Sequence, residues 1–136
     1  MLFCAVLLAT AGCSQMGAPQ HAGQPTEQGK SMAAMLADVN LILAFTYGSG
    51  DQRTAEAAAT DLVAWSNRMA ELFPPGQASQ DYVDMSPERA RNAPVAMQRV
   101  ANQLLTTVRG GSRSLIGGRL DQVEQDGCGA CHLSHP

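Results

Sequence analysis

The chain closes on the string Cys128-Gly129-Ala130-Cys131-His132, with four further residues after it. On a helix, side chains three residues apart lie on neighbouring points of one turn, so the Cys128 and Cys131 thiols can reach one edge of a flat ligand. The pattern Cys-x-x-Cys-His is the attachment signature of c-type haem, whose two vinyl groups form thioethers with the cysteines while the histidine binds the iron. The sequence therefore predicts one covalent haem, held by Cys128, Cys131 and His132.

Three other interpretations of this string stay open but fit less well. A zinc site needs four protein ligands, or three and a water molecule, and outside the string only Cys13, His21 and His135 remain once a leader is removed. A thioredoxin-like redox pair is expected at a strand-to-helix junction of an α/β fold, whereas this string ends a helical chain. A structural disulfide would not require His132. A haem-free thiol or metal-binding module is therefore the least favoured function.

Upstream of the string, the sequence shows four segments with helical periodicity and no convincing alternating strand. We expect helices near residues 26–47, 51–73, 86–109 and 113–131, with Gly and Pro between them. Pro94 should kink the third helix or break it near Asn92. The pair Gly117-Gly118 is a weak point in the fourth helix.

Apolar residues at helical spacing predict the buried face of each helix. The first helix should bury Met32, Met35, Val39, Ile42 and Thr46, with Leu36 and Leu43 widening the stripe. For the other three, the expected inward residues are Ala55, Ala58, Ala59, Leu62, Ser66, Met69 and Leu72, then Met97, Val100, Ala101, Leu104 and Val108, then Ile116, Leu120 and Val123. Four such helices favour an all-α, antiparallel four-helix bundle with the haem at the C-terminal end of the last helix. Few aromatic residues are available for the core, and a large apolar cofactor would fill that deficit.

The N-terminal residues indicate export. The uncharged apolar run Met1–Gly12 is too short to span a bilayer and has the length of the core of a secretory signal. The following string, Thr10-Ala11-Gly12-Cys13-Ser14, resembles the end of a bacterial lipoprotein signal, in which the cysteine carries the lipid. We therefore expect residues 1–13 to be a signal peptide, 14–25 a flexible tether and 26–136 the folded domain. The expected location is the periplasm, with Cys13 as a lipid anchor or, after simple cleavage, no anchor.

Charge and composition exclude other classes of function. The formal net charge is −3 and no basic patch is present, so nucleic acid is not an expected partner. The sequence contains no Ser-His-Asp constellation, no phosphate-binding Gly loop and no paired acids with an evident role, and we do not expect an enzyme.

A haem-attachment string at the very end of a four-helix chain resembles the class II c-type cytochromes, the cytochrome c′ family. The resemblance covers the body of the chain, residues 27–132, and includes the corner Phe73-Pro74-Pro75-Gly76 and the helix start Ser86-Pro87. It implies that Cys128 and Cys131 are the thioether positions and that His132 is the proximal ligand of one haem c.

The resemblance also implies a position for the distal ligand, near the start of the first helix. Counting back sixteen positions from Gly48 gives Met32. Met35, one turn along, is a competing ligand, and ordinary core packing is the alternative role for either methionine. Family members with Met at this position are six-coordinate electron carriers, whereas those with a bulky non-ligand bind small gases such as nitric oxide. His/Met ligation raises the reduction potential, and we expect electron transfer with redox partner proteins.

The chain departs from the family after the haem string. The last helix of the family usually continues and carries a basic residue, but here only Leu133-Ser134-His135-Pro136 follows. The exposed haem edge should therefore be less positive than usual, and His135 should be a solvent-facing residue rather than a ligand. Relatives in the family are often dimers through their first two helices, which implies a possible homodimer.

Overall fold

The computed structural model describes residues 26–74 and 87–131, and this part of the chain is almost entirely helical. In order, it contains α1 (Glu27–Thr46), α2 (Gln52–Leu72), α3 (Pro87–Arg109) and α4 (Arg113–Gln122). A π-helical segment, Val123–Gly127, and a 3₁₀ turn, Cys128–Ala130, extend α4. The described ranges contain no strand, and none of their helices is long and apolar enough to cross a membrane.

Polar caps and glycines define the helix ends. The Thr26 hydroxyl accepts a hydrogen bond from the Gly29 amide at 3.1 Å, and the Asp51 carboxylate accepts one from the Thr54 amide at 3.0 Å. Each bond satisfies an amide that the first helical turn leaves without a partner. Gly48, with φ +86°, turns the chain after α1 in a left-handed conformation that glycine adopts without strain.

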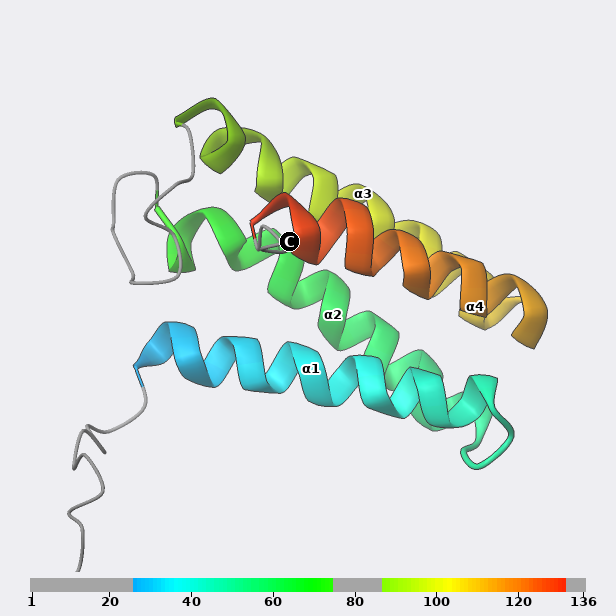
Figure 1. Cartoon of the computed structure of the whole chain (residues 1–136). Coiled ribbons are helices and arrows are strands. Elements are labelled where there is room, and N and C mark those ends of the chain that lie inside the picture. The colour runs from blue at the N-terminus through cyan, green and yellow to red at the C-terminus, as the bar shows by residue number, and fades with distance from the viewer. Residues whose placement is uncertain (1–25, 75–86, 132–136) are drawn as a thin grey trace, which may run out of the picture.

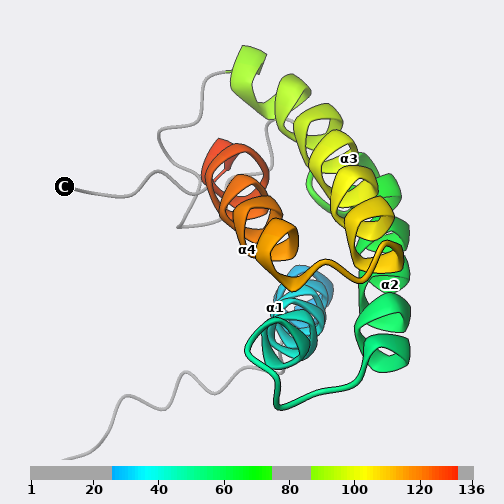
Figure 2. The same cartoon turned by 90° about the vertical axis from the view of Figure 1, so that its right-hand side faces the viewer.

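The four helices form a closed antiparallel bundle. Their directions alternate along the chain, and the start of α1 lies at the same end of the bundle as the end of α4 (Figure 1). Each helix contacts the next one in sequence, and α1 also contacts α4, whereas the diagonal pairs are not in contact. Figure 2 looks roughly along the bundle and shows the four helices arranged around a common centre, and all four contribute residues to one hydrophobic core. The predicted four-helix bundle is confirmed.

The residues expected to face inward on α2, α3 and α4 are all buried. On α1, the buried face is rotated relative to the expected one. Its buried residues are Ser31, Met35, Asp38, Ile42 and Phe45. Met32, Val39, Leu43 and Thr46 are only partly buried, and Leu36 is 62% exposed, so the inward placement of Leu36 was wrong. The apolar stripe is wider than the surface that α2 and α4 cover, which leaves Leu36 outside the core.

Details of the later helices also differ from the expectations. Of the two outcomes expected at Pro94, a kink or a break, the break does not occur, because α3 runs on through Pro94, whose ring is buried among the helices. The fourth helix is not α-helical as far as Cys131, because the α-helical hydrogen bonds end at Gln122 and the wider π-helical ones follow. Gly117 and Gly118 lie within α4 and do not interrupt it.

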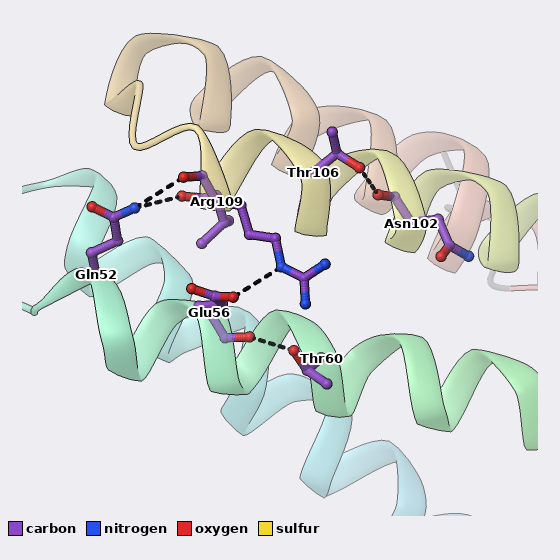
Figure 3. Close-up of polar contacts among 7 residues, drawn as sticks. Gln52, Glu56, Thr60, Asn102, Thr106 and Arg109 are labelled. Atoms are coloured by element: carbon purple, nitrogen blue, oxygen red, sulfur yellow. Dashed lines mark hydrogen bonds and ion pairs between the residues drawn. The ribbon is translucent and has the colours of Figure 1, made fainter.

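Hydrogen bonds between α2 and α3 fix the end of the bundle farthest from Cys128. The Gln52 amide nitrogen donates to the carbonyl oxygens of Val108 and Arg109, both at 3.2 Å, and thereby satisfies acceptors at the end of α3 (Figure 3). The Arg109 guanidinium donates to Glu56 Oε1 at 2.9 Å. These bonds hold α2 and α3 in register.

A groove of about 490 Å³ lies between α1 and α2 and contains a buried acid, Asp38. Asp38 is 9% exposed, and its Oδ2 atom has no hydrogen-bond partner. Burial raises the pKa of this carboxyl above its ordinary value of 3.8, the nearby Asp61 raises it further, and hydrogen bonding with the Trp65 side chain opposes both effects. The charged form of Asp38 is therefore disfavoured in the folded protein.

Replacing Asp38 by Asn should raise the free energy of unfolding at pH 7 by about 1 kcal/mol, because it removes a buried charge while keeping the side-chain shape. The folded protein holds the Asp38 proton to higher pH than the unfolded chain. Stability should therefore fall as pH rises from 3.8 toward the raised pKa and stay reduced above it.

Urea unfolding of both proteins across pH 3 to 8 measures this difference, which should vanish at the acidic limit. Asp61→Asn is the control and should gain less stability, because Asp61 is exposed. A D38N variant that is less stable than wild type at pH 7 would contradict the argument.

Candidate functional site

The two cysteines of the haem string lie on a 3₁₀ turn. The Cys131 amide donates to the Cys128 carbonyl at 3.1 Å, which closes the turn Cys128–Ala130. In a 3₁₀ helix, side chains at positions i and i+3 eclipse each other, whereas on an α-helix they are offset. The two thiol-bearing side chains are therefore more closely aligned than a continuous α-helix would place them.

Both cysteines are half-buried and pack against the hydrophobic core as thiols. Burial raises the pKa of the Cys128 thiol above its ordinary value of 9.0, and the nearby Glu124 carboxylate raises it further. A redox-active Cys-x-x-Cys pair needs the opposite, a lowered pKa that supplies thiolate at neutral pH. The environment of Cys128 therefore disfavours a thiol-redox module.

Gly127, directly before the first cysteine, is pressed against α3. A Cβ atom at this position would lie 2.6 Å from Met97 Sδ and 3.1 Å from Val100 Cγ2. Met97 is itself only 2% exposed, so it has little room to move. The absence of a side chain at residue 127 lets the segment approach α3 this closely.

An ion pair holds the same segment from its exposed side. The Arg99 guanidinium on α3 donates to Asp126 Oδ2 at 3.1 Å. Both side chains are about half exposed, so the pair contributes little to overall stability. The pair instead restricts the orientation of the π-helical segment, because it joins Asp126 to a fixed point on α3.

Met32 and Met35 differ in their surroundings. Met35 is 7% exposed and belongs to the core, whereas Met32 is partly buried at the edge of the core. Ala34 lines the groove with α2, and Met32, two residues earlier, lies about 200° around the helix from it. Met32 therefore lies on the flank of α1 away from α2, and α4 is the other neighbour of α1.

The arrangement at this end of the bundle fits a flat apolar group. The turn Cys128–Ala130 makes backbone contacts with α3 but with neither α1 nor α2 among the described elements. Leu36, one turn beyond Met32 on the same flank, is exposed although it is aliphatic. Two aligned thiols at the edge of the core suit a haem attached to Cys128 and Cys131.

Several predicted residues lie outside the described part of the chain. These are His132 and His135 after the turn, and Cys13 with the remaining residues of 1–25. Within the described ranges, no group of three or more His, Cys, Asp or Glu side chains could hold a metal ion. The sequence did not predict a role for Gly127, the Arg99–Asp126 pair or the π-helical segment. The glycine directly before Cys128 is the one sequence feature that could have indicated this close packing.

Comparison with known proteins gives one family. The family model described as Cytochrome C′ matches residues 26–135, which is most of the chain and includes the complete haem string. No match was found among curated proteins or among solved structures.

Proposed function

The chain belongs to the cytochrome c′ family of haem-binding c-type cytochromes, and from this premise we propose that it is an electron carrier with one covalent haem. Cys128 and Cys131 hold the haem through thioethers, and His132 and Met32 bind the iron. Bound haem supplies a one-electron couple between ferric and ferrous iron. No substrate binds, and redox partner proteins supply and accept the electron.

The placement of Met32 carries this proposal. Its thioether lies at the end of the bundle that holds both thiols and on the flank of α1 that α2 does not cover. Met35, the competing residue, already fills core volume in the described structure. A methionine at the edge of the core can reach outward to a ligand without leaving a cavity behind.

The partial exposure of Cys128 and Cys131 is a second observation that supports electron transfer. A haem edge bonded to Cys128 and Cys131 lies near the protein surface, where a partner protein can approach it. The residues deeper in the bundle are apolar, and a His/Met pair in such surroundings favours a raised reduction potential. We propose the periplasm as the location, because the N-terminal residues resemble an export signal with Cys13 as the lipid anchor.

An absorption spectrum tests the proposal. The protein is expressed with a cytochrome c maturation system, and spectra of the oxidised and reduced forms are recorded before and after carbon monoxide is added. We expect a low-spin reduced spectrum that carbon monoxide does not change. A high-spin spectrum that shifts at once would indicate an open distal face and the alternative function, binding of small gases such as nitric oxide.

A further inference from the structure

The π-helical segment before the haem string changes the direction in which Cys128 points. On a continuous α-helix, each residue advances by about 100°, so Cys128 would lie about 140° around the helix from Val123. Val123 is fully buried, and Cys128 would then lie on the flank of the helix, outside its buried stripe. In the structure, Cys128 instead packs against the core. The wider turn Val123–Gly127 delays the rotation and brings the cysteine inward.

This unusual turn is held by α3 rather than by its own hydrogen bonds alone. The Cys128 amide is shared between the carbonyls of Glu124 and Val123, so the backbone is intermediate between α-helical and π-helical hydrogen bonding. Gly127 lies against Met97 and Val100 at distances that leave no room for a Cβ atom. On the solvent side, Arg99 binds Asp126. All three contacting residues of α3 lie within one helical turn of each other.

We propose that this part of α3, Met97 to Val100, positions the haem-attachment turn. Gly127 lets the π-helical segment sit against α3, and the Arg99–Asp126 pair fixes its rotation, so that both thiols face the same side before haem is bound. Gly127 and Arg99 are thus positioning residues that act through Cys128. The inference rests on the proposed haem function and adds to it a requirement for residues outside the haem string.

The thioether chemistry explains why the rotation matters. Each thiol adds across one vinyl group, with the sulfur bonding to one carbon of the double bond and the hydrogen going to the other. Both cysteines have to present their sulfur atoms to one porphyrin edge for both additions to occur. A Cys128 thiol that points away would leave a haem attached through Cys131 alone.

The first test compares Gly127→Ala with Gly118→Ala, a matched control in the same helix. A Cβ at Gly118 meets no atom within 4 Å, so this variant should attach haem as wild type does. In Gly127→Ala, the added methyl group pushes the segment off Met97. Its chains should show a several-fold loss of doubly attached haem and a gain of singly attached haem. Alkylation of unreacted thiols followed by mass spectrometry of the C-terminal peptide counts the attached cysteines, and the reduced spectrum reports the altered ligand set.

A second pair of variants changes only exposed ion pairs and should leave the folded structure intact. Arg99→Gln removes the ion pair to Asp126, and Arg109→Gln removes the equally exposed pair to Glu56 at the far end of α3. Exposed pairs contribute little to stability, so both proteins should fold. Arg99→Gln should lower the doubly attached fraction, whereas Arg109→Gln should not. If Gly127→Ala fails to fold, this pair decides the question.

The outcomes separate the two proposals. Wild-type attachment in both Gly127→Ala and Arg99→Gln, with haem normal in the wild-type protein, would overturn the positioning role and leave the haem function standing. A wild-type protein without covalent haem would overturn the haem function and the positioning role together.

Discussion

Replacing both Cys128 and Cys131 by Ser should abolish covalent haem completely. A serine hydroxyl does not add to a vinyl group under the conditions in which a thiol does, so no bond to the protein can form. Any haem that still associates should be extracted by acidified acetone, which leaves thioether-bound haem on the chain. Haem-stained denaturing gels and the mass of the intact protein measure this all-or-none loss.

The single variants and a remote cysteine provide the controls for this experiment. Cys128→Ser and Cys131→Ser alone should each leave one thioether and shift the absorption of the pyridine complex of the denatured protein. Cys13→Ser should keep the full haem content, because Cys13 lies outside the haem string, although the proposed lipid anchor would be lost. Stained haem in the double variant would contradict the assignment of the two thioether positions.

Much of the fold could be predicted because the buried faces of three helices consist mostly of apolar residues at regular helical spacing. The inward residues of α2, α3 and α4 followed from that spacing alone. In α1, the buried line includes Ser31 and Asp38, whose polar side chains give no such signal. Ser31 is buried because its hydroxyl can donate to the Glu27 carbonyl at 2.8 Å within the helix. Which of the flanking apolar residues are covered then depends on how closely α2 and α4 approach.

The site shows the same division between local and distant causes. The spacing of Cys128 and Cys131 is a local property, and it predicted the attachment chemistry. The π-helical segment is not local, because it depends on Gly127 meeting Met97 and Val100 on a different helix. No periodicity in residues 113–131 indicates where the hydrogen bonding changes. A glycine inside a predicted helix usually weakens it, whereas Gly127 permits the close approach of this segment to α3.

Met32→Ala should convert the iron from six-coordinate to five-coordinate. The alanine methyl group cannot reach the iron, and the neighbouring side chains of Leu36 and Val39 on that flank of α1 are aliphatic and offer no ligand atom. The reduced protein should become high-spin and should bind carbon monoxide at once, while wild type resists it. The reduction potential should fall as well, because the thioether that favours ferrous iron is gone.

Met35→Leu is the matched control for this variant. Met35 is part of the core, and a swap of Met for Leu keeps volume and apolar character, at a cost of less than about 1.5 kcal/mol in stability. Its spectrum should remain that of wild type if Met32 is the ligand. The reverse pattern, with Met35→Leu five-coordinate and Met32→Ala unchanged, would move the ligand by one turn and preserve electron transfer. A Met32→Ala spectrum that matches wild type, with Met35→Leu also unchanged, would remove both methionines from the iron and with them the His/Met carrier.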